Sequence, residues 1–174
     1  MAWIDRESGL LLWGLIACAA HELGHIAAAL LMGVYPDRLT LSAVGAELSL
    51  RNRTLIPYWK DLLIVLAGPL ANLLFGLIAV AADLWLPAFL NFGIGVFNLL
   101  PVLPLDGGRI LFDALSVLVE APWPERILRV TAGLCIGVLL GAGAIVAMEY
   151  ANGTLLVTSV WLLLCVMKKG ENLN

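Results

Sequence analysis

The sequence predicts an all-α polytopic membrane protein with about five transmembrane helices and a short membrane-associated β-hairpin. Composition, apolar segments and the placement of basic residues carry this prediction. Hydrophobic residues make up 61% of the 174 residues and charged residues only 13%, whereas soluble domains average about 45–50% and about 25%. A chain of this length could not bury so much apolar surface in water, but a bilayer accommodates it.

Apolar segments follow one another along the chain. A spanning α-helix needs about 20 predominantly apolar residues. Pro101 and Pro104 break the third segment, and the fifth is short for a span. The predicted segments cover about 9–34, 62–86, 89–119, 127–148 and 155–167. We expect a single membrane-embedded domain over 1–174, with a core over about 8–119 and additional helices over about 126–168.

One stretch between the first two segments has a different period. Residues 38–50 alternate apolar and polar side chains around Gly45, which is typical of a β-hairpin. The alternative is an ordinary loop.

The basic residues predict the orientation. Threading five spans places eight of them on one side: Arg38, Arg51, Arg53, Lys60, Arg126, Arg129, Lys168 and Lys169. Arg109 falls near the same side and Arg6 on the other. Because Lys and Arg concentrate in cytoplasmic loops, we expect a cytoplasmic C-terminus and an external N-terminus. Interfacial aromatic residues fall near the predicted span ends: Tyr58, Trp59, Trp85 and Trp123.

Two further patterns concern partners. No basic run indicates nucleic acid, and the three cysteines lie far apart in apolar runs without a CxxC motif, which favours membrane packing over a disulfide framework or a metal site. Gly133, Gly137 and Gly141 repeat the GxxxG spacing that lets helices approach closely. Packing within the bundle is the favoured interpretation, and a homo-oligomer contact is the alternative.

The chemistry concentrates in the first segment, at residues 21–25, His-Glu-Leu-Gly-His. On a helix, His21 and His25 share one face, so two imidazoles can bind one metal while Glu22 acts as a base beside them. These are the 2 histidines of the chain. Three ionisable groups within an apolar span are expensive and indicate function; the alternative is a buried polar cluster for helix packing.

A catalytic zinc usually has three protein ligands and an open position. With no third histidine, the third ligand must be a carboxylate. Asp106 is favoured because Pro101 and Pro104 break the helix before it and two glycines follow it. Irregular backbone at membrane depth is tolerated where it is buried in protein or lines a cavity. The other internal candidates are Glu47, Asp61, Asp83 and Asp113, of which Asp113 lies on the resumed helix and could face the aqueous boundary.

These residues predict hydrolysis of a peptide bond. Zinc lowers the pKa of a bound water toward about 7 and polarises the carbonyl, and Glu22 takes the proton and delivers it to the leaving amine. Asn72, a polar residue inside an apolar span, is a candidate oxyanion donor. An interhelical hydrogen bond is the equal alternative for Asn72.

At residues 21–25, 67–72 and 98–108 the chain resembles the site-2 protease family of intramembrane zinc metalloproteases. The order and approximate spacing of these motifs also match. The resemblance implies one zinc ion per chain, held by His21, His25 and Asp106, with Glu22 as catalytic base. It also makes Asn98, beside Asn72, a candidate contact to substrate or oxyanion.

The third motif and residues 39–50 are most similar to the bacterial sporulation branch, which processes a sigma-factor precursor. The chain departs from that branch because it has no room for an extra helix before the motif helix and none for a CBS domain; a PDZ domain is also absent. The resemblance implies an enzyme of the bacterial cytoplasmic membrane, with its active site toward the cytoplasm. Its substrate would be a membrane-associated protein cleaved within or near its membrane segment.

Two other function classes compete with a membrane-embedded protease. A zinc-binding membrane scaffold or transporter would do no peptide chemistry, but such a site needs no base, so Glu22 argues against it. A soluble or secreted metalloprotease with an anchor would need a polar domain, and the apolar segments leave none.

Overall fold

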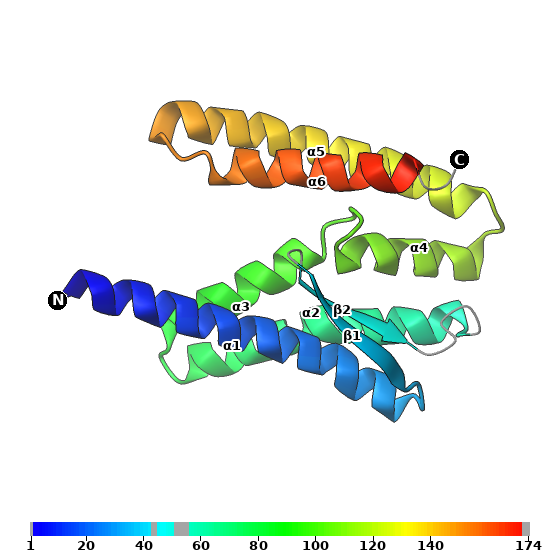
Figure 1. The fold of residues 1–174 in the computed structure, drawn as a ribbon, viewed down its shortest axis with the longest axis horizontal. Coiled ribbons are helices and arrows are strands. Elements are labelled where there is room, and N and C mark those ends of the chain that lie inside the picture. The colour runs from blue at the N-terminus through cyan, green and yellow to red at the C-terminus, as the bar shows by residue number, and fades with distance from the viewer. Residues whose placement is uncertain (1, 43–44, 51–55, 172–174) are drawn as a thin grey trace. The chain divides into compact units, whose positions relative to one another are not determined.

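The computed structural model describes residues 2–42, 45–50 and 56–171. The chain divides into two compact units, Met1–Asn98 and Leu99–Asn174. The predicted single domain over 1–174 stays a prediction. In chain order the elements are α1 (Ala2–Leu31), β1 (Pro36–Ser42), β2 (Gly45–Leu50), α2 (Tyr58–Ala81), α3 (Trp85–Asn98), α4 (Asp106–Leu118), α5 (Trp123–Tyr150) and α6 (Thr154–Glu171) (Figure 1).

In the first unit, α1 ends in a left-handed glycine cap. Gly33 has φ +70, a conformation that glycine adopts without steric cost. The N–H of Val34 then donates to Ala29 O at 2.8 Å, as in a Schellman motif. Val34 and Ala29 pack with Ile64 of α2 in a buried apolar cluster, so the chain reversal after α1 also anchors α2.

The strands β1 and β2 follow α1. They form a two-stranded antiparallel sheet in which Leu41 pairs with Ala46 and Ser42 with Gly45. The sheet lies at the position of the predicted hairpin, and its association with a membrane stays a prediction.

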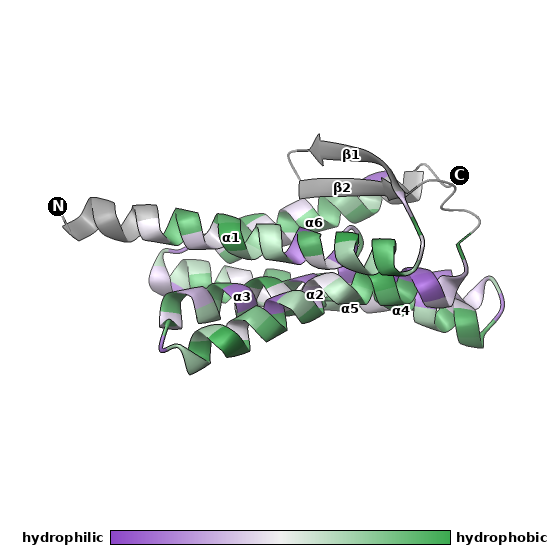
Figure 2. Cartoon of the chain, turned by 90° about the horizontal axis from the view of Figure 1, so that it is seen from below, coloured by the Kyte–Doolittle hydropathy of each residue, from purple (hydrophilic) through white to green (hydrophobic). Residues whose placement is uncertain are grey.

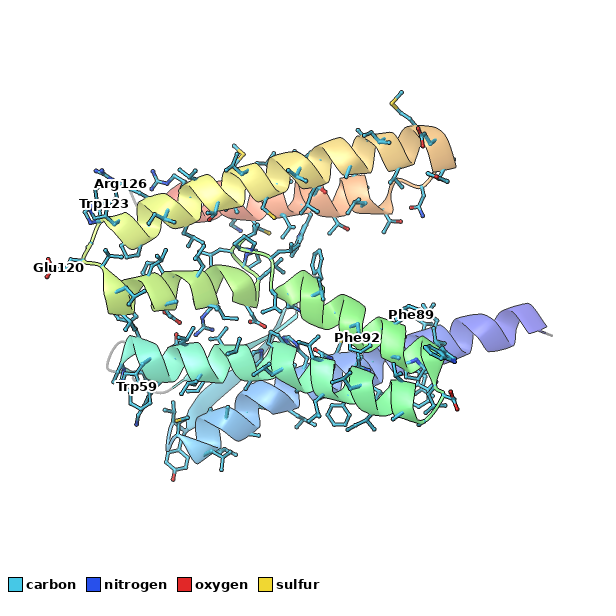
Figure 3. All side chains as sticks on the ribbon, turned by 180° about the vertical axis from the view of Figure 1, so that it is seen from behind. Trp59, Phe89, Phe92, Glu120, Trp123 and Arg126 are labelled. Carbon is cyan, nitrogen blue, oxygen red and sulfur yellow. The ribbon has the colours of Figure 1, made fainter. Side chains whose placement is uncertain are left out.

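Helices α2 and α3 pack closely after a tight turn (Figure 1). Asp83 has φ 57 in this turn, and the N–H of Leu84 donates to Ala79 O at 2.9 Å. Gly76 of α2 makes room for the ring of Phe92 (Figure 3), because a Cβ at Gly76 would lie 2.7 Å from that ring. The contact brings α3, and with it Asn91, against α2.

In the second unit, an irregular segment over 99–105 folds back onto the start of α4. A Cβ at Gly107 would collide with the carbonyl group of Leu99, and one at Gly108 would lie 2.7 Å from Leu103 N. The N–H of Leu105 donates to Val102 O at 2.8 Å. The two glycines therefore allow the backbone approach that the sequence predicted at the helix break.

Helices α5 and α6 pack against each other, and the close approach lies at Gly143. A Cβ there would be 2.8 Å from Leu156 Cα. At Gly133, Gly137 and Gly141, by contrast, an added Cβ would meet nothing within 4 Å. In the described part of the chain, the contact between α5 and α6 therefore uses Gly143 and not these three glycines, whose packing elsewhere in the bundle stays a prediction.

Three of the described helices are long and apolar enough to cross a membrane: Gly9–Leu31 of α1, Tyr58–Ala81 and Trp123–Tyr150. Large hydrophobic side chains are exposed on them, for example Leu15 and Val138, and Figure 2 shows hydrophobic residues along these helices. The expected count of about five transmembrane helices is not supported in the part of the chain that the structure describes. The 14 residues of α3 rise only about 21 Å, less than the hydrocarbon thickness of about 30 Å, and the apolar part of α6 is also shorter.

Aromatic residues open three of the described helices. Tyr58, Trp85 and Trp123 are the first residues of α2, α3 and α5. The guanidinium of Arg126 lies 5.6 Å from the ring centroid of Trp123 (Figure 3). Such cation–π pairs suit the boundary between headgroups and acyl chains, where tryptophan has one apolar and one polar side.

Candidate metal centre

The two histidines lie one turn apart on α1. His21 is buried and His25 half-buried, and their ring centroids are 4.8 Å apart with an interplanar angle of 87°. Glu22 follows His21 directly on the same helix and is half-buried. The motif therefore gathers both imidazoles at one level of α1, as the i, i+4 spacing predicted.

Helix α2 binds one nitrogen of each imidazole ring. His25 Nδ1 lies 3.0 Å from Ile64 O. A backbone carbonyl only accepts hydrogen bonds, so the proton of His25 resides on Nδ1. His21 Nδ1 lies 2.6 Å from Asn72 Oδ1, so the position of the proton on His21 follows from the direction in which the amide of Asn72 is turned.

A second backbone carbonyl determines that orientation. Asn72 Nδ2 donates to Ala17 O at 2.9 Å and to Asn91 Oδ1 at 3.0 Å. Turning the amide over would put its oxygen against Ala17 O, two acceptors without a proton between them. Asn72 Oδ1 therefore faces His21, and His21 carries its proton on Nδ1.

The two Nε2 atoms face each other at 3.2 Å. A hydrogen bond at this distance would need a proton on one of them, but in the neutral rings both protons are on Nδ1. Two lone pairs thus converge on one point. Tetrahedral zinc with Zn–N bonds of about 2.0–2.1 Å requires an N···N distance of about 3.3–3.4 Å. The histidine pair therefore fits a shared metal ion and does not fit a hydrogen-bonded pair.

Glycines at the crossing of α1 and α2 make this approach possible. A Cβ at Gly24 would lie 2.7 Å from Ala67 O, and one at Gly68 would overlap the ring of His25. Any larger residue at either position would push the helices apart, and the Nδ1 bonds that α2 provides would lengthen.

Asp106 and Asn98 border the irregular segment between α3 and α4. Asp106 is the first residue of α4, where a carboxylate interacts favourably with the helix dipole. Asn98 is the last residue of α3, and its Nδ2 donates to Ile94 O at 3.0 Å. Asp106 belongs to the second unit and Asn98 to the first, and their roles stay predictions. Asp113 lies further along α4 and is buried rather than exposed to water.

The structure changes the interpretation of Asn72 and adds a residue that the sequence analysis missed. Both amide hydrogens of Asn72 are bonded inside the first unit, so this arrangement leaves none for an oxyanion, and the interhelical hydrogen bond is the better of the two interpretations. Asn91 was not singled out. The feature of the sequence that could have pointed to Asn91 is a polar amide inside an apolar helix, and Asn72 has the same feature.

The comparisons with known proteins place the chain in a peptidase family. The family model for peptidase family M50 matches residues 10–87 and 79–142. The chain belongs to peptidase family M50. The matched ranges include His21, Glu22 and His25 in the first and Asp106 in the second. Together with the three long apolar helices, membership in M50 makes the chain an integral membrane protein.

Two curated relatives match different lengths of the chain. A putative zinc metalloprotease of Synechocystis sp. is 36% identical over 104 residues, which are 53% of this chain and 27% of that protein. Stage IV sporulation protein FB of Bacillus subtilis is 29% identical over 160 residues, 80% of this chain and 54% of that protein. The chain thus spans about a quarter to about half the length of these curated relatives.

The fold also matches a solved structure, the site-2 protease from Methanocaldococcus jannaschii. The TM-score is 0.63 at 24% sequence identity, with 91% of this chain and 76% of that chain covered. At this identity the match shows that the M50 chain shares the fold of that protein.

Proposed function

We propose that this M50 chain is an intramembrane zinc metalloendopeptidase that hydrolyses peptide bonds of membrane-associated proteins within or near their membrane segments. The observation that carries the proposal is the pair of Nε2 lone pairs, 3.2 Å apart, on a helix that also holds Glu22. Zinc is the metal in the name of the relative from Synechocystis.

His21, His25 and Asp106 would hold the zinc ion. Two imidazole nitrogens and one carboxylate leave a position open for water, as catalytic zinc sites require. Asp106 is the carboxylate that begins a helix directly after an irregular segment, so its side chain is carried by backbone that Gly107 and Gly108 hold against residues 99–103. When bound, zinc would activate a water molecule and polarise the scissile carbonyl group.

Glu22 would move the proton. Its carboxylate accepts a proton from the attacking water and gives it to the nitrogen of the leaving amine, so that the peptide bond breaks into a carboxylate and an amine. A zinc scaffold or transporter would bind the same metal without needing this transfer. Asn98 is a candidate contact to the substrate at the end of α3.

Cleavage in the host membrane tests the proposal. Membrane proteins from cells with the wild-type chain should be compared by proteomics with those from cells with a Glu22→Gln variant. Uncut substrates should accumulate only with the variant. Identical membrane proteomes at equal expression would favour the scaffold or transporter.

For the topology we propose a cytoplasmic C-terminus, an external N-terminus and an active site toward the cytoplasm, in a bacterial cytoplasmic membrane. The support is the distribution of Lys and Arg, of which Lys60, Arg126 and Arg129 lie near the starts of α2 and α5. Threading the predicted spans places these residues on the same side as the C-terminus, and the positive-inside rule identifies that side as the cytoplasm.

Reporter fusions test this topology. A reporter that is active only outside the cytoplasm should be active after fusion near Met1 and inactive after fusion at Asn174, and a cytoplasm-specific reporter should give the reverse. Both fusions should be made in the Glu22→Gln background so that proteolysis does not release the reporter. The same side for both ends would contradict the proposed topology, which requires an odd number of crossings.

We propose that the β1–β2 sheet takes up substrate by strand addition. Peptide bonds inside a substrate helix are already hydrogen-bonded, so the helix must unwind before attack, and a free strand edge offers partners to the released backbone groups. Ala46 pairs with Leu41 in this sheet. Ala46→Pro removes a backbone N–H and disturbs the ladder.

The expected result for Ala46→Pro is a turnover that falls by about tenfold or more, the equivalent of at least about 1.4 kcal/mol in the barrier, while zinc content is unchanged. Ala46→Val is the matched control, because it keeps the N–H and suits a strand. Turnover and bound zinc are measured on the same purified samples. Normal turnover of the proline variant would reject strand addition at this position.

A homo-oligomer is the remaining partner prediction. The open face of α5 at Gly133, Gly137 and Gly141 supports contact with a second copy, since small residues at this interval suit helix association in lipid.

A further inference from the structure

Asn91 is a buried amide on α3 that none of the roles above uses. It is 5% exposed and lies in a helix that is otherwise almost entirely apolar. A buried amide destabilises a protein unless its donors and acceptor are bonded. Asn91 Oδ1 accepts from Asn72 Nδ2 at 3.0 Å, and Asn91 Nδ2 donates to Pro87 O at 2.9 Å.

In the series of hydrogen bonds that links Asn91 to His21 through Asn72, only one assignment of donors and acceptors is possible. At one end Pro87 O can only accept, so Asn91 must present Nδ2 to it and Oδ1 to Asn72. At the other end His21 Nδ1 must donate, because it meets Asn72 Oδ1 at 2.6 Å. Reversing the amide of Asn91 would place two donors face to face.

Asn91 also determines the plane of the Asn72 amide. The two hydrogens of an amide nitrogen lie in the plane of its oxygen. Asn72 donates one hydrogen to Ala17 O and the other to Asn91 Oδ1. These two hydrogen bonds together fix the orientation of the amide plane. With Ala17 O alone, the amide could pivot about a single hydrogen bond and carry Oδ1 away from His21.

We propose that Asn91 is a positioning residue for the metal centre: through Asn72 it holds the proton of His21 on Nδ1 and directs the Nε2 lone pair at the metal. The proposal rests on the proposed role of His21 as a zinc ligand. All four groups in this relay, the histidine, the two amides and the Ala17 carbonyl, lie in the first unit, on α1, α2 and α3.

The two histidines differ in how they are held. His25 Nδ1 is bonded to the backbone carbonyl of Ile64, which no side-chain substitution removes. His21 depends on two side chains. Substitutions in the relay should therefore weaken metal binding through His21 while the geometry of His25 is retained.

The test is a double-mutant cycle on the full chain in detergent, with zinc affinity measured by competition with a chelator. Asn72→Leu should weaken zinc binding by about 10–100-fold, the usual effect of losing the partner of a ligand, and Asn91→Leu by about tenfold. Because Asn91 acts only through Asn72, the double variant should bind zinc no more weakly than Asn72→Leu alone. Ser159→Ala is the matched control, since Ser159 is a fully buried side chain on α6 that also donates to a carbonyl four residues earlier.

A second measurement separates positioning from packing. Cobalt in place of zinc should show an altered visible absorption spectrum in both relay variants, because the direction of the His21 ligand changes, and the Ser159→Ala spectrum should equal that of the wild type. Should Asn91→Leu fail to fold, Asn91→Ser, which keeps a donor for Pro87 O but is too short to reach Asn72, should give the same loss of about tenfold.

Normal zinc affinity and an unchanged cobalt spectrum in the Asn91 variants would overturn the proposal, as would penalties that multiply in the double variant. A His21→Ala variant distinguishes this failure from failure of the proposed function. If His21→Ala keeps wild-type zinc affinity, the ligand assignment itself is wrong. If His21→Ala loses zinc while the Asn91 variants keep it, only the relay is wrong.

Discussion

Glu22→Gln should abolish peptide cleavage while zinc remains bound. Glutamine has nearly the shape of glutamate but cannot accept the proton of the attacking water, and loss of a general base typically lowers rates by about 10²–10⁴-fold. His21 and His25 are unchanged, and their Nδ1 bonds to α2 do not involve Glu22. Metal analysis and a cleavage assay on the same purified variant check both halves of the expectation.

The matched control for Glu22→Gln is Glu125→Gln, the same change at an exposed glutamate in the first turn of α5. It should cleave like the wild type. Near-normal activity of Glu22→Gln would remove Glu22 from the reaction, and loss of zinc together with activity would mean that Glu22 supports the metal instead.

Asp106→Ala should lose both zinc and cleavage. His21 and His25 alone would leave zinc with two protein ligands, fewer than catalytic sites use, so the loss of affinity should exceed the about 10–100-fold typical of an outer-shell partner. Asp106→Cys supplies a thiolate that zinc accepts and should recover part of the binding. Zinc content after purification and affinity by chelator competition measure the effect.

Asp113→Ala is the comparison for Asp106→Ala, because Asp113 is a carboxylate further along the same helix. It should keep zinc at a substantial level. Thermal melting should be recorded alongside, since Asp113 is buried and its replacement affects stability. Full zinc in Asp106→Ala with loss in Asp113→Ala would place the ligand further along α4.

Local patterns predicted those parts of the protein that depend on neighbours in the sequence. The i, i+4 spacing of His21 and His25 put both rings on one face of α1, and the proline and glycine pairs around Leu105 predicted the break that precedes Asp106 at the start of α4. The expected count of about five transmembrane helices is not supported in the described residues, because apolar composition does not reveal where a helix ends. Residues 89–98 belong to the short helix α3, which begins at Trp85 and ends at Asn98.

Contacts between helices could not be predicted in this way. GxxxG spacing drew attention to Gly133, Gly137 and Gly141, yet the approach of α5 and α6 lies at Gly143, because the angle and register of two packed helices decide which small residue meets the neighbour. Asn72 shows the same limit. Its position in an apolar helix predicted a polar role, but its direction toward His21 required the partners that α1 and α3 supply.

By itself the sequence determined that the chain belongs in a bilayer and carries two histidines and a glutamate at metal-site spacing, because composition and helical period are local properties. Only the tertiary structure decided which nitrogen of each histidine is left for the metal. That choice depends on acceptors far away in the sequence: Ile64 O for His25, and for His21 the amide of Asn72, which Asn91 and Ala17 O hold in place. A proton on an imidazole goes to the nitrogen whose partner can only accept it, and packing alone brings that partner there.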